Sequence, residues 1–450
     1  MARKKAVEDQ PLITAEQLRT ISVEDISKMC YLQYGSYVNN NRAIANVADG
    51  LKVSYKRLIY ATLQYPKGQD IATHVLIPSL QRWHPHSTVG CEGLNAQLVK
   101  SGVFSGHGFF GTVQIDGVDM PHAATRYTKN RLSDLYWDVL GDLYKEVPYI
   151  ESPQGELEPA YLPLVFPLCL YLKSSVTGLG VAVNCVYPNF SPKSLYQAYI
   201  NNDPNLLEPN VDLMLDKTKS DLQGLWKNGK GRLIYVYKVS RAKSPDGLTE
   251  GVLFETKDGT EIFTPKLSAF DKLVQDGKVF IENLTDTDGN KLFVGRIPGA
   301  KGITVEDIET IAKKCCYDST TYLLNVTNGI SVFRIPLYDW LDYTYKNYIN
   351  LITQVNEKKI ERCKFDIKVQ ESIPVIGNYI LNVNPKATDE EISEKLKLTM
   401  DVVSQVMSKP ISYLRTNKDT SSRVKTLKDK LKDLQNFNPI EYTENIINKL

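Results

Sequence analysis

The sequence predicts an α+β multidomain protein, and three patterns along its 450 residues carry that prediction. Apolar residues recur at helical spacing in residues 30–155, alternate as in β-strands through 156–335, and return to helical stripes after residue 336. A chain of this length holds about two to four domains, each with a core of its own.

The composition is that of a soluble globular protein, with 42% hydrophobic and 24% charged residues. The formal net charge is only +2, so the chain is not a polybasic protein. If it binds nucleic acid, it must do so through local basic patches.

Neither disulfides nor a membrane span is expected. The seven cysteines form no C-x-x-C pair, which favours a reducing cytoplasm over a secreted framework or a zinc ribbon. The N-terminus, "MARKKAVEDQ", lacks the apolar core of a signal peptide. The most apolar stretch, "YLPLVFPLCLYL" (161–172), is too short and too rich in proline to cross a bilayer.

Residues 1–29 are predicted to be a polar N-terminal arm, and residues 30–155 a helical module. Within the module, 46–65 predicts a glycine-containing turn and a helix, and 89–102 predicts a second helix. The stretch "FSGHGFFGTVQIDG" (104–117) predicts a glycine loop with a short strand or hairpin. A long helix is expected after Tyr127, ending at Pro148. This order of elements is typical of a winged-helix domain.

Residues 156–335 predict mostly antiparallel strands, because alternating stretches such as "GVLFETKDGTEIFTP" carry "DG" turn signals. From Leu337 to Val355, apolar residues fall at three- and four-residue steps, and a second such stripe runs from Val424 to Leu434. We expect an antiparallel coiled coil of 336–372 and 416–440, with a small helical domain at 373–415 between its two helices. The alternative is two unrelated amphipathic helices on a globular core.

The stretch "HAATRYTKN" places Arg126 directly before Tyr127. A phenol with a pKa near 10 is a weak nucleophile at neutral pH and needs electrostatic help, which a guanidinium can supply. Taken alone, the dipeptide is more often an ordinary solvated helix start.

Two further groups of residues are candidates for DNA contacts. Lys52, Lys56 and Arg57 lie at or near the start of a helix, a place suited to phosphate oxygens, although a solvated basic face is the alternative. His84 and His86 flank Pro85 without any cysteine or carboxylate at metal-ligand spacing, so no zinc site is expected. His86 could donate a hydrogen bond or relay a proton.

Four stretches, correctly ordered across residues 42–192, resemble the breakage–reunion subunit of type IIA DNA topoisomerases, the gyrase A and topoisomerase IV A family. They are "NRAIANVADGLKVSYKRLIYA", "WHPHST", "GHGFFGTVQIDG…AATRYT" and "SSVTGLGVAVNCVYPNFSP". The resemblance implies a winged-helix DNA-cleavage domain at 30–155, a tower domain at 156–335, and a C-terminal dimer gate at 373–415.

The resemblance also implies roles for single residues. Tyr127 would attack DNA and form a 5′-phosphotyrosyl link, with Arg126 and Arg42 steadying the charge on the scissile phosphate. His84 and His86 would lie near the tyrosine. Leu179 would intercalate between base pairs, and its glycine neighbours would let the backbone approach DNA closely; the alternative is a leucine packed inward at a turn.

Some features depart from the family pattern. "GQGNFG" stands here as "GHGFFG" (106–111), and a His-Arg-Arg run is replaced by Tyr55, Lys56 and Arg57. The chain ends at residue 450, which leaves no room for the DNA-wrapping β-pinwheel domain of gyrase A. We therefore expect relaxation or decatenation rather than negative supercoiling, and a compact, phage-encoded enzyme fits this expectation.

The sequence contains no G-x-x-x-x-G-K-[ST] loop, Bergerat-type ATP site or TOPRIM-type acidic cluster. The resemblance therefore implies a separate B-type ATPase/TOPRIM subunit that uses ATP and holds Mg²⁺, together with a homodimer of this chain on double-stranded DNA in a bacterial or phage-infected cytoplasm. The alternative is a non-catalytic winged-helix architectural protein. A tyrosine recombinase would need its nucleophile near the C-terminus, and Tyr127 comes too early.

Overall fold

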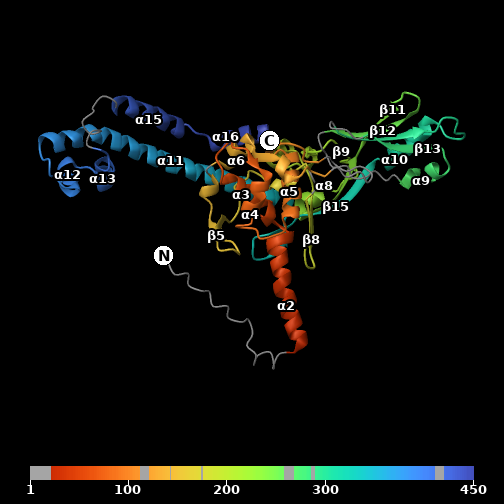
Figure 1. The fold of residues 1–450 in the computed structure, drawn as a ribbon, viewed down its shortest axis with the longest axis horizontal. Coiled ribbons are helices and arrows are strands. Elements are labelled where there is room, and N and C mark those ends of the chain that lie inside the picture. Colours follow the sequence, from red (N-terminus) through yellow and green to blue (C-terminus); the bar gives the residue numbers. More distant parts are fainter. Residues whose placement is uncertain are drawn as a thin grey trace. The chain divides into compact units, whose positions relative to one another are not determined.

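The computed structural model describes residues 22–111, 121–141, 143–173, 176–257, 268–284, 289–410 and 420–450. These ranges form helices and mainly antiparallel sheets, which confirms the predicted α+β class (Figure 1). The chain divides into two compact units. Unit 1 holds residues up to Asp134, Tyr149–Tyr161 and Phe166–Asp342; unit 2 holds Leu135–Pro148, Leu162–Val165 and Tyr343–Leu450. The winged-helix, tower, coiled-coil and gate assignments stay predictions.

Helices form the first part of unit 1. They are α2 (Val23–Val38), the π-helical turn η1 (Asn39–Ala43), α3 (Val53–Leu63), α4 (Thr73–Leu80) and α5 (Thr88–Lys100). The turn and helix predicted within residues 46–65 are confirmed, because Gly50 adopts a left-handed backbone with a φ of 67° and α3 begins three residues later. A Cβ on Gly50 would lie 2.5 Å from the Cβ of Pro167, so only glycine fits this turn.

A three-stranded antiparallel sheet follows, in the order β2 (Ile71–Ala72), β4 (Lys129–Leu132) and β3 (Phe104–His107). Strand β4 occupies residues that were expected to begin a long helix after Tyr127, and that prediction is wrong. The backbone of β4 pairs with strands on both sides, and among the described residues between Tyr127 and Pro148 only Asp134–Leu140 (α6) is α-helical. Gly141, with a φ of 40°, ends α6, and a 3-10 turn, η3 (Leu143–Lys145), follows.

The strands of residues 156–335 are mostly antiparallel, as predicted, and most of them form two sheets. The five-stranded sheet has the order β7 (Val176–Leu179), β8 (Asn184–Tyr187), β15 (Tyr317–Leu323), β10 (Lys230–Val236) and β9 (Met214–Leu215). The four-stranded sheet has the order β11 (Lys238–Lys243), β12 (Glu250–Lys257), β14 (Gly289–Arg296) and β13 (Val279–Asn283). Gly231, Leu233 and Tyr235 of β10 are buried while Lys230 and Arg232 are exposed, which is the alternation of a strand with one covered face.

Short elements complete unit 1. A hairpin is formed by β5 (Tyr149–Glu151) and β6 (Leu157–Pro159), and β6 lies near α3. Strand β1 (Ala45–Asn46) pairs in parallel with β16 (Asn325–Thr327), which also pairs with β17 (Val332–Arg334). The remaining elements are α7 (Pro192–Asn201), α8 (Leu222–Asn228), α9 (Ser268–Gln275), α10 (Val305–Cys315), η4 (Leu168–Leu170) and η5 (Pro204–Leu206).

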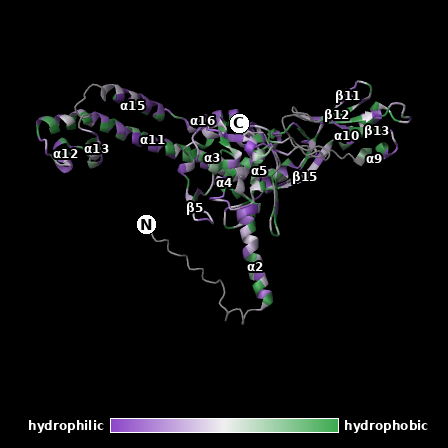
Figure 2. Cartoon of the chain, viewed as in Figure 1, coloured by the Kyte–Doolittle hydropathy of each residue, from purple (hydrophilic) through white to green (hydrophobic). Residues whose placement is uncertain are grey.

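Most of α11 (Leu337–Asn382), from Tyr343 onward, belongs to unit 2, and its apolar stripe is buried at Tyr345, Tyr348, Ile352 and Val355. The helix α15 (Thr420–Gln435) runs antiparallel to it. The second predicted stripe of apolar residues, Val424 to Leu434, lies on α15 and is half-buried, whereas most other residues of α15 are hydrophilic (Figure 2). The antiparallel direction follows from the cross-helix contacts. Asn356 Nδ2 donates to Leu434 O (2.9 Å), near the end of α15, whereas farther along α11 the contacts are to earlier residues of α15, with Cys363 Sγ to Leu427 O at 3.3 Å and Glu371 to Lys428 at 2.8 Å.

The far end of α11 carries a small helical core. Helix α11 continues to Asn382, beyond the expected boundary at residue 372, and its last turns pack against α12 (Asp389–Leu396) and α13 (Met400–Met407). Ile373, Ile376, Ile392 and Val403 are buried together there. The chain then returns through α15 to α16 (Pro439–Lys449).

Within the described ranges, no helix combines the length and the apolar character that a membrane span requires.

Candidate functional site

Arg126 and Tyr127 lie on a short 3-10 turn, η2 (Thr125–Tyr127), directly before strand β4. The side chain of Tyr127 is 66% exposed, and the Arg126 guanidinium carbon lies 4.6 Å from the centre of its ring. A cation over an aromatic face is attracted to its negative quadrupole. The phenol is therefore accessible to a large substrate and has a fixed positive charge beside it.

The turn is held by backbone contacts on both of its sides. Tyr127 N donates to Ala124 O (2.8 Å), and Thr128 O accepts from Thr73 N (3.0 Å) at the start of α4. Gly108, with a φ of 111°, comes so close that a Cβ there would lie 2.8 Å from Tyr127 O. The glycine loop thus packs directly against the turn that presents Tyr127; its second half, 112–117, lies outside the described residues.

Four of the predicted DNA-binding residues line one pocket in unit 1, with a volume of about 440 Å³. They are Arg42, Lys52, His84 and His86. The other lining residues are Asn41, Ser54, Tyr55, Ser87, Gly90, Cys91, Leu94 and Gln97. No carboxylate belongs to this lining among the described residues, so the pocket has the electrostatic character of an anion site. Neither Tyr127 nor Leu179 lines it.

The two cations of this pocket differ in their surroundings. Arg42 is exposed and lies in η1. Lys52 is half-buried just before α3, and its ammonium donates a hydrogen bond to Thr177 O. Burial lowers the pKa of Lys52 below its ordinary value.

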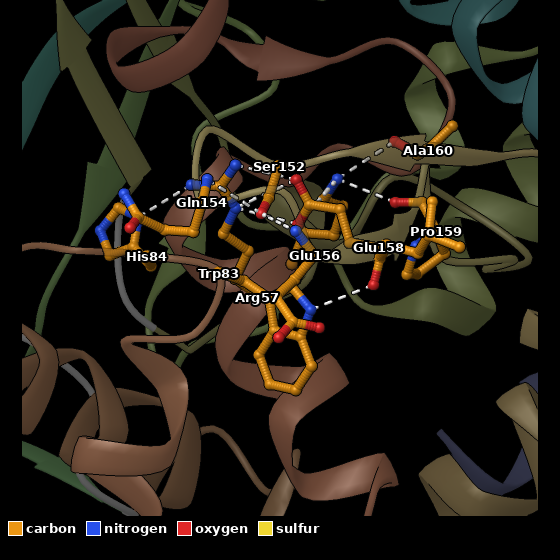
Figure 3. Close-up of polar contacts among 11 residues, drawn as sticks. Arg57, Trp83, His84, Ser152, Gln154, Glu156, Glu158, Pro159 and Ala160 are labelled. Atoms are coloured by element: carbon orange, nitrogen blue, oxygen red, sulfur yellow. Dashed lines mark hydrogen bonds and ion pairs between the residues drawn. The ribbon is translucent and has the colours of Figure 1, made fainter. Parts of the chain in front are cut away.

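Lys56 and Arg57 do not lie on a solvated basic face, and the structure corrects that alternative. Both side chains are buried in the body of α3 and contact the carboxylate of Glu158 on β6. Arg57 makes a bidentate pair, with Nε to Oε2 at 2.9 Å and Nη2 to Oε1 at 2.8 Å (Figure 3). These charges compensate one another inside the protein, which leaves Lys56 and Arg57 little exposed surface for the direct contact with DNA phosphate that the sequence suggested.

The two histidines of the His-Pro-His segment have different environments. Their rings lie edge to face, 5.3 Å apart, but His86 is exposed and His84 is half-buried. Burial and the nearby positive charge of Arg57 lower the pKa of His84 to about 4. His84 is therefore neutral at neutral pH.

Leu179 ends strand β7, and its side chain is 86% exposed. The alternative of an inward-packed leucine is therefore wrong. Its glycine neighbours serve close contacts within the protein, because a Cβ on Gly178 would lie 1.9 Å from Ala43 O and one on Gly180 would lie 2.1 Å from Asn39 Oδ1. An exposed leucine on a tightly seated hairpin is a rigid apolar tip.

Sequence reasoning missed Glu158 and the pair of Tyr55 and Gln97, whose Oη and Oε1 atoms lie 2.6 Å apart at the pocket. Glu158 comes 101 residues after its partner Arg57. The available signal was the pair of adjacent cations at 56 and 57 on an otherwise apolar helix, which requires a buried counter-charge.

Comparison with known proteins identifies the family. The family of the DNA gyrase and topoisomerase IV A subunits matches residues 42–236. The chain is 30% identical to the DNA gyrase A subunit of Spiroplasma citri over 37% of its own length and 77% of the relative. It is 22% identical to that of Brachyspira hyodysenteriae over 95% of its own length and 54% of the relative.

The chain is 31% identical to the DNA gyrase A subunit of Borrelia hermsii over 38% of its own length and 22% of that relative. The chain thus spans about half the length, or less, of several relatives that it matches. The match to the Spiroplasma citri protein extends over more than two thirds of that relative at 30% identity. The chain belongs to the family of the DNA gyrase and topoisomerase IV A subunits.

Proposed function

We propose that this chain is the DNA-gate subunit of an ATP-dependent type IIA topoisomerase. In this proposal a homodimer of the chain cuts both strands of one duplex, lets a second duplex pass, and reseals the first. Family membership supports the class of enzyme. The observation that carries the catalytic assignment is the exposed phenol of Tyr127 beside the guanidinium of Arg126.

In the cleavage step, the phenolic oxygen of Tyr127 forms a bond to the scissile phosphorus and the bond to the 3′-oxygen of the DNA breaks. The 3′-oxygen leaves as a hydroxyl by taking up a proton, and the phenol gives up its own proton. Arg126 stabilises the negative charge that builds on the phosphate. Because one phosphodiester replaces another, resealing by the reverse step needs no external energy.

The cationic pocket would hold DNA phosphates near this step. Arg42 and Lys52 offer charge-assisted hydrogen bonds to phosphate oxygens, which position a duplex without reading its sequence. The exposed Leu179 is available to wedge between base pairs and bend the duplex.

The described residues do not fit a Mg²⁺ site. Mg²⁺ prefers oxygen ligands, carboxylates above all, whereas the described lining of the pocket has two cations and no carboxylate, and no group of three possible metal ligands occurs in the part of the chain described. We assign Mg²⁺ and ATP to a B-type ATPase/TOPRIM partner. Relaxation and decatenation, rather than gyrase-type wrapping, stay a prediction.

The test is covalent capture of DNA. The chain is mixed with its B-type partner, ATP, Mg²⁺ and supercoiled plasmid, and the reaction is stopped with denaturant. Wild type and a Tyr343→Phe control, which changes another exposed tyrosine, should yield protein-linked DNA, whereas Tyr127→Phe should yield none. If the wild type also yields none while still binding DNA, the chain is a non-catalytic architectural protein.

A further inference from the structure

The buried pair of Glu158 and Arg57 continues to a third residue, His84. Arg57 Nη1 lies 3.3 Å from His84 Nδ1, while its Nε and Nη2 atoms bind Glu158 (Figure 3). The Glu158 side chain is 1% exposed and that of Arg57 is 9% exposed. One guanidinium therefore bridges a fixed carboxylate on β6 and an imidazole that lines the pocket.

This geometry selects one tautomer of His84. A guanidinium nitrogen can only donate, so Nδ1 must accept with its lone pair. A hydrogen on Nδ1 would set two donors against each other. The ring hydrogen is therefore on Nε2, at the opposite edge of the imidazole from Arg57.

Lys56 adds to the rigidity of the pair. Its ammonium lies 3.5 Å from Glu158 Oε2 and donates to Pro159 O at 2.8 Å. Glu158 is thus held by two cations on successive residues of α3. The carboxylate cannot turn away from Arg57 without leaving a buried charge uncompensated, which is costly.

The charged and titratable groups that face His84 are Arg57, His86, Glu158 and Arg42. Burial lowers the pKa of His84 most, the positive groups lower it further, and Glu158 opposes them, with a result of about 4. The neutral ring that the hydrogen bond requires is therefore the form present at neutral pH.

We propose that Glu158, acting through Arg57, is a positioning residue that fixes His84 as a neutral Nε2–H donor to an oxygen of the bound DNA backbone. The inference rests on the proposed function for its DNA acceptor, but the tautomer is a property of the chain alone. His84 shares its pocket with Arg42 and Lys52, so an acceptor with negative charge is the ligand that fits.

In this tautomer His84 cannot act as a proton shuttle. Nδ1 is occupied by Arg57 and Nε2 already carries its hydrogen, so the ring has no lone pair with which to accept the phenolic proton of Tyr127. His84 contributes a hydrogen bond, and another group must take that proton.

Two near-isosteric substitutions test the donor role. In His84→Gln the side-chain amide nitrogen takes the place of Nε2 and can still donate to DNA. In His84→Asn the amide oxygen takes the place of Nδ1 and keeps the Arg57 contact, but the donor is lost. We expect the rate of covalent-complex formation to stay within about 10-fold of wild type for Gln and to fall about 100-fold for Asn and Ala.

The pH profile adds a readout that a structural role would not change. His84→Gln should keep the wild-type pH dependence of cleavage, because no proton moves through His84. If the Gln variant is as impaired as the Ala variant, or the Asn variant is as active as wild type, the donor role is overturned.

The positioning role of Glu158 is tested without DNA. The full chain is labelled with ¹⁵N-histidine, and the two ring nitrogens of His84 are assigned among five histidines with the His84→Gln variant. Wild type should show a protonated Nε2 and an unprotonated Nδ1 near neutral pH. Glu158→Gln should mix the tautomers, whereas Glu156→Gln, which removes a carboxylate that pairs with the exposed Arg82, should not.

Arg57→Lys provides a second variant in case Glu158→Gln does not fold. A lysine keeps the charge beside Glu158 but cannot span both partners, so the tautomers should mix here as well. A protonated Nδ1 in wild type, or an unchanged His84 spectrum in the folded variants, would overturn the inference. Failure of the wild type to form covalent DNA complexes would instead overturn the proposed function and leave the tautomer result standing.

Discussion

At the scale of single residues, the site contains two kinds of cation, which are exposed or pocket-lining side chains and side chains buried against a carboxylate. Arg42 and Arg126 are exposed, and Lys52 lines the pocket, whereas Lys56 and Arg57 are buried against Glu158. The buried pair is not expected to contribute much net stability, because desolvation offsets its attraction. The contact between Arg57 and His84 indicates that the pair instead orients the side chain of His84.

The lowered pKa of His84 predicts an acid-sensitive fold. The folded protein holds His84 neutral down to a pKa of about 4, whereas the unfolded chain binds a proton near its ordinary value of 6.5. Because the unfolded state binds more protons between these values, stability falls as pH decreases from about 6.5 to about 4. For a half-buried ring screened by solvent, we expect a loss of about 1 kcal/mol from pH 7 to pH 5.

Urea unfolding of wild type and His84→Gln at the two pH values measures this contribution. The Gln variant lacks the titrating ring, so its stability should fall less than that of wild type over the same interval. Equal losses in the two proteins would show that His84 titrates normally.

At the scale of elements, glycines decide how closely the hairpin of β7 and β8 approaches its neighbours. The backbone of Gly178 lies against Ala43 O and Cys185 Sγ, at distances that leave no space for a Cβ. The same hairpin presents Leu179 to solvent, and the side-chain amide of Asn39 donates through Nδ2 to Val181 O and accepts through Oδ1 from Val181 N. The tip is thus anchored to the turn η1 that also carries Arg42.

Substitution of Gly178 by alanine should therefore be strongly destabilising. A Cβ at 1.9 Å from Ala43 O forces the hairpin away from η1, at a cost of about 3 kcal/mol or more. Gly93→Ala is the matched control, because Gly93 lies in α5 with no atom within 4 Å of an added Cβ. Alanine there should stabilise the helix by roughly 0.5–1 kcal/mol.

Thermal unfolding of the two variants measures whether each substitution lowers or raises the stability of the protein. The midpoint should fall for Gly178→Ala and rise for Gly93→Ala. Shifts of the same sign would mean that the hairpin relaxes without strain.

At the scale of the whole molecule, positive and negative charges nearly balance, so DNA binding depends on where the cations lie. A net charge of +2 cannot hold a polyanion by itself, whereas a pocket with two cations and no carboxylate among its described lining residues can. The salt dependence of DNA affinity should thus be governed by few residues.

We expect the double variant Arg42→Ala/Lys52→Ala to lower the slope of log K against log salt concentration by up to about 2, since each lost phosphate contact removes about 0.9. The control Lys386→Ala/Lys395→Ala removes two exposed cations outside the pocket and should leave the slope unchanged. Fluorescence anisotropy of a labelled duplex over a salt series gives both slopes. A control slope that falls as far as the pocket variant's would assign binding to diffuse charge.

The α+β class, the helices at α3, α5 and α11, and the antiparallel strands after residue 156 could all be predicted from the amino-acid pattern, because each depends on periodicity within a short window. The sequence also shows Arg126 directly before Tyr127, and it indicates the candidate site residues Arg42, Lys52, His84 and His86. That residues 129–132 form a strand could not be predicted in this way, because the strand depends on pairing with β2 and β3 in the folded protein. Likewise, burial of Lys56 and Arg57 and the tautomer of His84 depend on Glu158, a carboxylate 101 residues away from Arg57 along the chain, and no local pattern records such a contact.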